Sequence, residues 1–552
     1  MISRLQINIF NCSFWSIPSQ RRPTQSTFSE KGDLGTTIHI EYHRRMSITD
    51  PFTLILGISA IFILYVVVNR PKVDPREPPL IKPKIPIIGH LLGVIQHGMP
   101  YYAATYANNP QPAFTLDLLF SKSYVINTPS LVAAVQRNSK IISMDPFMTF
   151  AAKAMAGVTG PGLKLLQEKD SGGGGLNQDV VHAMSPSLLG AGLDPMNRTM
   201  IRNLIGFIDD LKNRGSTQFD LHGWCQHAIT IASMDSVYGP LNPYRLEEIE
   251  EALWDYESNL GGLILNIIPQ ITTRKAWKAR EKIVAAFVNY YNADGQKDAS
   301  EMTHGRWKTQ HDAGAKTEDI ARLEAATGIA ITSNTTPATF RMLFEVYSRP
   351  ELLESLREEI LTKAVRIEGN VYTIDLAAIR DNCALLLSTY QEILRLRSNA
   401  TPTRQVKSDI LLANTYHLKA GSVLQMPTQS VNCEHGNGPQ PDFNPRRYLA
   451  KDEQKLRSTG NLFFGTSPNM CPGRHFATGE ILAMAAMMFL RYDISSVTGW
   501  KEPKLNTRAL AASILPLDEE FPVTVTVRTE FEGVEWRFDV TEGKGKYALV
   551  TG

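Results

Sequence analysis

Residues 464–477 read FGTSPNMCPGRHFA, and this stretch decides the fold. Pro468 and the pair Pro472–Gly473 interrupt regular backbone on both sides of Cys471, because proline lacks an amide N–H and fixes its own φ. The run ILAMAAMMFL that follows (481–490) is wholly apolar and predicts a buried helix. Cys471 is therefore expected just before a helix N-terminus, where free N–H groups and the helix dipole stabilise a thiolate.

Two kinds of chemistry fit a cysteine held in this way: nucleophilic catalysis and ligation of a haem iron. A nucleophile needs a general base beside it, and the nearby His475 would have to turn back from inside the following helix. The remaining cysteines are scattered and form no CxxC pair, which disfavours a zinc site or a disulfide framework and fits a reducing compartment. They are Cys12, Cys225, Cys383 and Cys433. Taken alone, the local sequence favours the haem ligand only slightly.

The composition is that of a globular protein with a large core. The chain has 552 residues, 43% of them hydrophobic, and a formal net charge of +2. Neither the class of disordered chains nor that of fibrous proteins fits this balance. Because the charges nearly cancel and no basic stripe with interleaved aromatic residues occurs, we expect no nucleic-acid partner.

An apolar run near the N-terminus predicts a membrane anchor. Residues 52–68 read FTLILGISAIFILYVVV, without a charge, and this length is near the lower limit for crossing a bilayer, about 17–25 residues. Arg70, Lys72 and Arg76 follow, which favours a cytosolic location for the rest of the chain. A cleaved signal peptide is the alternative, but no cleavage site of small residues follows the run. We predict a single transmembrane helix over 50–69.

The anchor divides the chain into parts of different composition. Residues 1–45 are polar and without clear period, which indicates an N-terminal extension. Residues 70–93 are rich in proline, which precludes a continuing helix and favours a stiff hinge. We expect residues 94–552 to form the catalytic domain.

Hydrophobic periodicity in the catalytic domain predicts mostly helices. The clearest expected helices cover residues 321–347, 350–361 and 379–396. Strand-like segments are short: 523–528 alternates with period two, and 411–427 reads as short strands joined at residues 419–421. The predicted fold class is mainly α with a minor β-sheet, preceded by one N-terminal transmembrane helix.

The segment around Cys471 resembles the haem-binding loop of the cytochrome P450 family, FxxGxxxCxG. The resemblance implies the cytochrome P450 fold, with haem b as cofactor and Cys471 as the axial ligand of the iron. The cofactor-binding residues that it implies are Phe464, Gly465, Cys471, Gly473 and Arg474. Ser467 stands where the family usually has glycine, and Asn469 stands where Arg or His commonly contacts a haem propionate, which puts propionate anchoring at Asn469 in question.

Two further family motifs are structural. Glu392 and Arg395 form an ExxR pair, whose i,i+3 spacing puts both side chains on one face of the helix expected over 379–396. The segment 441–448, PDFNPRRY, looks like the family's FxPxR loop, with Arg447 in the place of its arginine. In the family these three side chains hold the haem-side core together and have no direct chemical role.

The long helix over 321–347 carries a fourth match. The family uses an acid–threonine pair here to deliver protons to bound dioxygen; Thr335 takes the threonine place and Asn334 replaces the acid. Because an amide cannot give a proton, water and Thr335 would carry the relay. In isolation, a hydroxyl bonded to its own helix backbone is the simpler interpretation of Thr335. The segment 334–340, NTTPATF, is similar to the sterol 7α-hydroxylase and prostacyclin synthase branch.

The ordered set of motifs implies a microsomal-type monooxygenase. One oxygen atom of dioxygen would enter a lipophilic substrate, a sterol, terpenoid or other secondary metabolite, with electrons from an NADPH-cytochrome P450 reductase. Family position places substrate contacts at 398–401 and 511–516, which are small or apolar. The implied location is the endoplasmic reticulum membrane, with the catalytic domain in the cytosol. A P450-fold isomerase or dehydratase that acts on a peroxide without NADPH, and a non-catalytic haem protein, stay open as alternatives.

Overall fold

The computed structural model describes Gly57 and residues 74–549 with several short gaps. The gaps are 87, 119–120, 171–174, 215–216, 434–441, 450–460, 508 and 543–544. The predicted extension (1–45) and, apart from Gly57, the predicted anchor (50–69) lie outside the described residues. Among the residues that are described, no helix combines the length and the apolar character needed to cross a membrane.

Helices dominate the described chain, as the periodicity predicts. Those before the long central helix are α2 (Gly89–His97), α3 (Pro100–Asn108), α4 (Pro129–Arg137), α5 (Asp145–Ala154), α6 (Gly160–Asp170), α7 (Leu176–Met184), α8 (Asp194–Arg214), α9 (Leu221–Tyr238), α10 (Glu247–Ser258), α11 (Leu260–Leu265), α12 (Pro269–Thr272), α13 (Arg274–Asn292) and α14 (Glu301–Asp312). The central helix and its successors are α15 (Thr317–Tyr347), α16 (Pro350–Ala364), α17 (Leu376–Asn382), α18 (Ala384–Arg397), α19 (Thr428–Cys433) and α21 (Arg474–Arg491).

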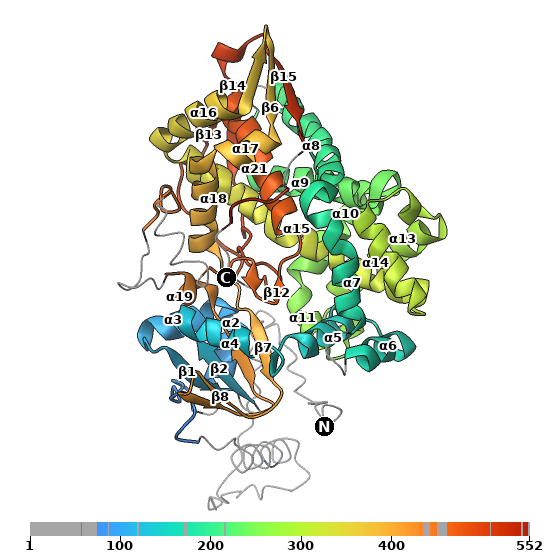
Figure 1. Cartoon of the computed structure of the whole chain (residues 1–552), viewed down its shortest axis with the longest axis vertical. Coiled ribbons are helices and arrows are strands. Elements are labelled where there is room, and N and C mark those ends of the chain that lie inside the picture. The colour runs from blue at the N-terminus through green and yellow to red at the C-terminus, as the bar shows by residue number, and fades with distance from the viewer. Residues whose placement is uncertain are drawn as a thin grey trace, which may run out of the picture. The chain divides into compact units, whose positions relative to one another are not determined.

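The strands are short and form small sheets. They are β1 (Ala113–Asp117), β2 (Lys122–Ile126), β3 (Ile142–Ser143), β4 (Phe219–Asp220), β5 (Val365–Glu368), β6 (Val371–Asp375), β7 (Thr403–Val406), β8 (Ile410–Leu412), β9 (Tyr416–Leu418), β10 (Val423–Gln425), β11 (Gly465–Thr466), β12 (Asn469–Met470), β13 (Tyr492–Ser496), β14 (Pro522–Val527) and β15 (Glu535–Asp539). The largest sheet has the order β1-β2-β10-β7-β3, in which β10 runs parallel to β2 and the other pairs are antiparallel. Within residues 71–552 this sheet lies beside α2, α3 and α4, away from the helices α8 to α15 (Figure 1).

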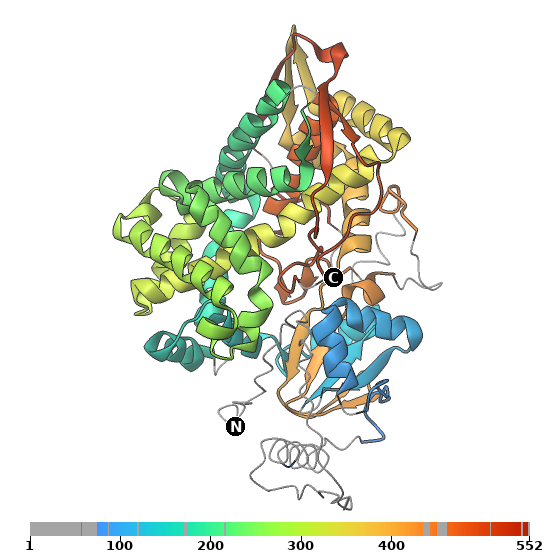
Figure 2. The same cartoon turned by 180° about the vertical axis from the view of Figure 1, so that it is seen from behind.

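Two long helices form the centre of the core. α15 is buried at every position from Thr335 to Tyr347, and α21 is buried from His475 to Arg491 except at Ala477. Both views place α15 between the α9–α10 side of the molecule and α18 (Figure 1 and Figure 2). The apolar run that predicts a buried helix after Cys471 is therefore confirmed, and the helix expected over 321–347 begins four residues earlier, at Thr317.

The helix expected over 379–396 is wrong at one point, because the chain forms two helices that meet at Cys383. Cys383 has φ −91° and ψ 72°, outside the helical region. The break is stabilised from a distance: the Glu359 carboxylate of α16 accepts the backbone N–H groups of Leu385 and Leu386 at 3.0 and 2.9 Å. A carboxylate at a helix N-terminus satisfies free donors and opposes the positive end of the dipole. Local periodicity does not contain this contact.

The strands expected over 411–427 are confirmed, with one turn more than predicted. β8 and β9 pair antiparallel, and the turn between them contains Ala413 and Asn414 at φ +50° and +55°. β9 then leads through residues 419–421 to β10, which belongs to the largest sheet. Alanine rarely adopts a positive φ, whereas asparagine does so more readily, so Asn414 was the one residue of this pair that indicated a turn.

One carboxyl group lies in the middle of the core. Glu480 of α21 is fully buried, and Ser233 of α9 donates its hydroxyl to both carboxyl oxygens at 2.8 Å. Burial raises the pKa of Glu480 to about 8, although the bond from Ser233 acts in the opposite direction. The folded protein therefore keeps this group protonated at neutral pH.

This pKa predicts a pH-dependent stability. An unfolded Glu480 releases its proton near pH 4.5 and the folded one near pH 8. The contribution of Glu480 to the free energy of unfolding is therefore largest below pH 4.5. Between pH 4.5 and 8 it falls by up to about 1.4 kcal/mol per pH unit. We expect Glu480→Gln to flatten this decline, measured as the thermal unfolding midpoint between pH 5 and 8. Exposed Glu251→Gln is the control, and equal slopes for wild type and Glu480→Gln would contradict the prediction.

Candidate active site

A short hairpin holds Cys471. β11 and β12 pair antiparallel, with Gly465 opposite Met470, and the Cys471 N–H donates to the Phe464 carbonyl at 2.8 Å. Gly465 has φ +81°, and a Cβ there would come within 3.1 Å of the Asn469 carbonyl, so the hairpin requires glycine. α21 begins at Arg474, three residues after Cys471, as predicted.

The hairpin is fastened to two other elements. The Gln136 side chain of α4 donates to the Thr466 hydroxyl at 2.5 Å, and the Arg404 guanidinium of β7 donates to the Thr466 carbonyl at 3.3 Å. Arg474 donates to the Cys471 carbonyl at 2.9 Å. The backbone on both sides of the sulfur is thus fixed by contacts from α4, β7 and α21.

The electrostatics of Cys471 differ in part from the expectation of a stabilised thiolate. Its side chain is exposed, yet the surrounding protein raises the pKa of its thiol by burial, while the Gly473 N–H and the Arg474 charge lower it. These two contributions have the expected sign, but burial outweighs them. The sulfur opens to a space that protein encloses, where a bare thiolate is costly. A metal ion at the sulfur would supply the missing positive charge, because coordination deprotonates a thiol.

The nucleophile interpretation lacks its base. His475 is 4% exposed, and its Nδ1 accepts the Tyr547 backbone N–H at 3.2 Å. Burial lowers its pKa to about 4. The imidazole is therefore engaged by the C-terminal segment instead of the cysteine. Cys225 and Cys383 are buried, and burial raises the pKa of each thiol.

The three predicted structural residues form one buried ion network. Arg395 donates to both oxygens of Glu392 at 2.8 Å, and Arg447 donates to one of them at 2.9 Å. Both guanidinium groups also donate to the Asp442 carbonyl, and the Asn444 N–H donates to Glu392 at 2.9 Å. The network joins α18 to the loop 442–449, so residues from the two separate motifs meet in the fold.

Thr335 and Asn334 lie side by side on α15 but make different contacts. The Thr335 hydroxyl donates to the Ile331 carbonyl at 3.0 Å, one turn back on its own helix. The Asn334 amide oxygen accepts the backbone N–H of Ser513 at 2.5 Å. Thr335 therefore has the backbone bond of the simpler interpretation, and Asn334 links α15 to the segment 511–516.

The two segments expected to contact substrate meet at this point. The Asn399 N–H donates to the Ser513 carbonyl at 2.5 Å, and Ser398 forms an isolated β-bridge with Ile514. Next to them, α15 leaves one strip uncovered: Ala330 is exposed and Ile331 and Asn334 are half-buried, between fully buried neighbours. The residues after α18, the 511–516 segment and this strip of α15 thus border one region.

Arg404 is a residue that the sequence analysis missed. It is 3% exposed, and its recorded bonds go only to the carbonyl oxygens of Thr403 and Thr466. Burial lowers its pKa to about 10, and the negative charge of Asp145 opposes this shift. A buried guanidinium without a carboxylate bonded to it fits an anionic group beside the cysteine hairpin. Sequence reasoning missed Arg404 because β7 lies next to Thr466 only in the folded chain.

These observations fit a haem. The sulfur of Cys471 is reachable for an axial bond, and Arg404 sits where a propionate needs a cation, while the exposed Asn469 has no side-chain hydrogen bond recorded in the described chain. Phe464, half-buried, packs edge-on against Phe463 at 5.4 Å between ring centres, and Gly473 leaves open space around its Cα. The propionate anchor that Asn469 lacks is thus available from another element.

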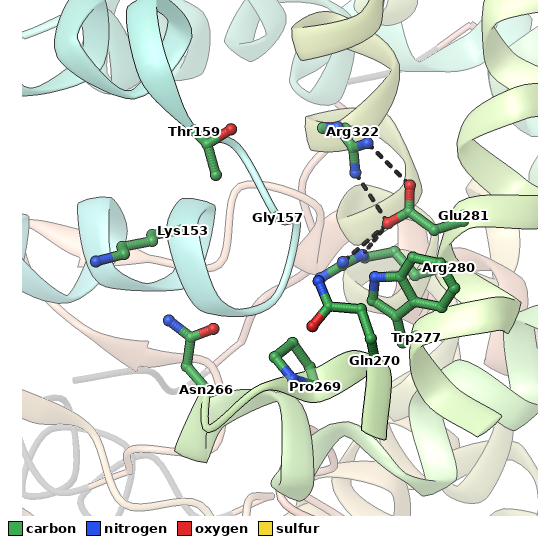
Figure 3. A pocket seen from close by; sticks show the side chains of 10 residues that line it. All are labelled: Lys153, Gly157, Thr159, Asn266, Pro269, Gln270, Trp277, Arg280, Glu281 and Arg322. Atoms are coloured by element: carbon green, nitrogen blue, oxygen red, sulfur yellow. Dashed lines mark hydrogen bonds and ion pairs between the residues drawn. The ribbon is translucent and has the colours of Figure 1, made fainter. Parts of the chain in front are cut away.

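A separate hollow of about 300 Å³ lies between the α5–α6 connection and α11–α13 (Figure 3). It is lined by Lys153, Gly157, Thr159, Asn266, Pro269, Gln270, Trp277, Arg280, Glu281 and Arg322. On one side Arg322 donates to both oxygens of Glu281 at 3.0 and 2.8 Å, whereas Lys153 stands on the other side. None of the residues that the motifs single out lines this hollow, so it is not the catalytic centre.

Known proteins agree with this site. The Cytochrome P450 family model matches residues 78–519. The chain is 45% identical to cytochrome P450 monooxygenase nodJ of Hypoxylon pulicicidum, over 90% of this chain and 99% of that protein. It is 26% identical to a cytochrome P450 monooxygenase of Gibberella zeae, over 88% of this chain and 96% of the relative.

More distant similarities point the same way. Cholesterol 7-alpha-monooxygenase of Cricetulus griseus is 23% identical over 84% of this chain and 96% of its own length, in line with the 334–340 resemblance. The structure of a retinoic acid-bound cyanobacterial P450, CYP120A1, superposes with a TM-score of 0.65 at 15% identity, covering 82% of this chain and 99% of that one. The chain therefore belongs to the cytochrome P450 family, and it is a haem-thiolate monooxygenase.

Proposed function

We propose that this monooxygenase inserts one oxygen atom from dioxygen into a C–H or double bond of a lipophilic secondary metabolite. The observation that carries the proposal is the Cys471 hairpin, fixed from three elements and open at the sulfur. The lipophilic substrate is supported by the small and apolar residues of 398–401 and 511–516, which border the uncovered strip of α15. The fungal relatives above are named as monooxygenases.

Each residue at the hairpin has a distinct role toward haem. Cys471 would ligate the iron, and Arg404 would hold a propionate by its charge. Haem bound in this way supplies the activation and cleavage of dioxygen, which electron donation from a thiolate favours. The contacts of Gln136 and Arg404 to Thr466 fix the hairpin that carries Cys471.

Proton delivery falls to Thr335 and the water that it orders. Its hydroxyl donates its one hydrogen to the Ile331 carbonyl, so its oxygen can accept a hydrogen bond from a water molecule and hold that water in place to deliver the proton. Asn334 cannot give a proton, and its amide oxygen is occupied by Ser513. We therefore assign Asn334 a positioning role: it holds the 511–516 segment against α15.

The electrons would come from NADPH through a membrane-bound reductase on the Cys471 side. Lys451, Lys455 and Arg457, which could contribute a basic docking face, lie outside the described residues. The location at the endoplasmic reticulum rests on the apolar run of 52–68 and the positive charges after it. A peroxide isomerase on the same haem would turn over without NADPH, so NADPH dependence of product formation separates the two functions.

The ligand assignment predicts a spectrum. Ferrous haem with a thiolate ligand binds carbon monoxide with a strongly red-shifted band, and we expect Cys471→His to lose that band because imidazole donates less charge to iron. Cys225→Ala, Cys383→Ala and Cys433→Ala are the controls, and each should keep the band. Retention of the shifted band by Cys471→His would place the ligand elsewhere and remove the basis of the proposed function.

The relay predicts uncoupled turnover. We expect Thr335→Ala to keep haem but to release peroxide, so that product per NADPH falls by roughly 100-fold, the lower range for a positioned proton transfer. Thr339→Ala is the matched control, because the Thr339 hydroxyl is buried and bonds the Thr335 carbonyl at 2.8 Å in the same manner, one turn further on. Normal coupling in Thr335→Ala, or equal uncoupling in both variants, would exclude Thr335 from the relay.

The anchor predicts a change in fractionation. Removing residues 1–69 deletes the apolar run but leaves the hairpin and the ion network intact, so we expect much of the protein to leave the membrane fraction while the carbon monoxide band is kept. The measurement is immunoblotting of membrane and soluble fractions. A full-length protein that is already soluble would show that the run does not anchor the chain.

A further inference from the structure

Two polar side chains on α10 are buried without partners. Glu257 is 4% exposed, and within the described chain its carboxyl group has no hydrogen bond and no ion pair; its Oε1 is fully enclosed. Trp254 lies one turn earlier, and its indole Nε1 is also enclosed without an acceptor. The i,i+3 spacing puts both on the same side of α10. A donor and an acceptor thus stand next to each other, both unused.

Other buried carboxyl groups of this chain have partners. Glu392 binds two arginines, Glu359 caps α18, and Glu480 receives the Ser233 hydroxyl. Burial alone raises the pKa of Glu257 to about 7, and no cation or donor acts on it. Leaving a buried polar group unpaired costs about 1–3 kcal/mol. Because buried polar groups are normally hydrogen-bonded, the unpaired carboxyl group of Glu257 indicates a partner that the protein alone does not supply.

The neighbours of Glu257 on the helix show which way this side of α10 faces. Leu253, one turn before, reaches α15: a Cβ on Gly328 would lie 3.4 Å from its Cδ1. Gly261, one turn after and already in α11, lies against Leu510, whose Cδ1 would be 3.2 Å from a Cβ there. Glu257 therefore sits between α15 and the segment that begins at Leu510.

This direction leads to the region that substrate would occupy. Gly328 itself is buried, and the uncovered strip of Ala330, Ile331 and Asn334 begins two residues further along α15. Asn334 binds Ser513, three residues after Leu510. The pair on α10 therefore lies beside the region bordered by the α15 strip and the 511–516 segment. α10 packs against α13 and α15, whereas the Cys471 hairpin leads directly into α21.

We propose that Trp254 and Glu257 recognise a hydroxyl group at the end of the lipophilic substrate that is remote from the oxidised carbon. A hydroxyl both accepts and donates, so it would take the indole N–H and give its proton to the Glu257 carboxyl oxygen. This inference rests on the proposed function and adds the polar end of its substrate.

Other polar groups fit the pair less well. A carboxylate substrate would bring a second acid next to Glu257 with no cation near it. An ammonium group would pair with Glu257 but leave the Trp254 N–H without an acceptor, because it has donors only. A substrate without a polar end leaves both atoms unpaired, as they are in the free protein. Of these groups, the hydroxyl is the one that satisfies both an indole N–H and a carboxylate oxygen.

The test is binding of matched alcohol and hydrocarbon pairs to the haem-loaded full-length protein. The probes are steroids, diterpenes and long-chain alkanes with one terminal hydroxyl, each against its deoxy parent, and the readout is the haem difference spectrum during titration. Wild type is compared with Glu257→Leu, Glu257→Gln and Trp254→Phe. Glu251→Gln, on the exposed face of α10, is the control. The carbon monoxide band of each variant separates a failure of this proposal from a failure of the proposed function.

We expect the wild type to bind the preferred alcohol roughly 10-fold more tightly than its parent, as for one or two net hydrogen bonds. Glu257→Leu should lose this preference and Trp254→Phe most of it, whereas Glu257→Gln, which keeps an acceptor, should retain part and Glu251→Gln all of it. Glu257→Leu should also raise the thermal unfolding midpoint, which shows that the variant folds. This rise is expected whether or not Glu257 binds substrate, so it does not test the proposal. Equal binding of every alcohol and its parent by the wild type, or an unchanged preference in Glu257→Leu, overturns the proposal.

Discussion

The carboxylate of Glu392 is shared by two buried guanidinium groups, and the geometry of the active site depends on this arrangement. Arg395 comes from the same helix, but Arg447 comes from a loop more than fifty residues later in the chain. Burying charged groups is costly unless they are paired. Glu392 is the acceptor that both arginines share, so its removal would take a charged partner from each of them. The network therefore holds the loop 442–449 against α18.

The sequence predicted those features whose cause is local. Three local patterns appear as the expected helix or strand: the apolar run after Cys471, the helical periodicity of 350–361 and the alternation in 523–528. The motifs pointed to Cys471 as the ligand and predicted the ion network because the spacing of their residues is itself local, and the family added their meaning. Taken singly, each of these patterns is short; their common order along the chain made the prediction specific.

The parts that could not be predicted are contacts between distant segments. Glu359 of α16 stabilises the break at Cys383 between α17 and α18. Arg404 contacts Thr466 only after the largest sheet has formed. Asn334 takes the place of the family's acid in the sequence, but its partner, the main-chain N–H of residue 513, is visible only in the structure. Neither periodicity nor spacing records such partners. The sequence likewise cannot show that Trp254 and Glu257 on α10 are buried without hydrogen-bond partners, because this too depends on distant segments.

The link between α15 and Ser513 has a consequence for how such an enzyme changes its substrate in evolution. Both strong contacts of Ser513 are made by its main chain, the N–H to Asn334 and the carbonyl to Asn399. The path of this segment is therefore set independently of the side chain that it carries at 513. Mutation can therefore exchange that side chain without changing these two main-chain contacts. If residues 511–516 border the substrate, as proposed, this one position combines tolerance to substitution with an influence on which substrate is accepted.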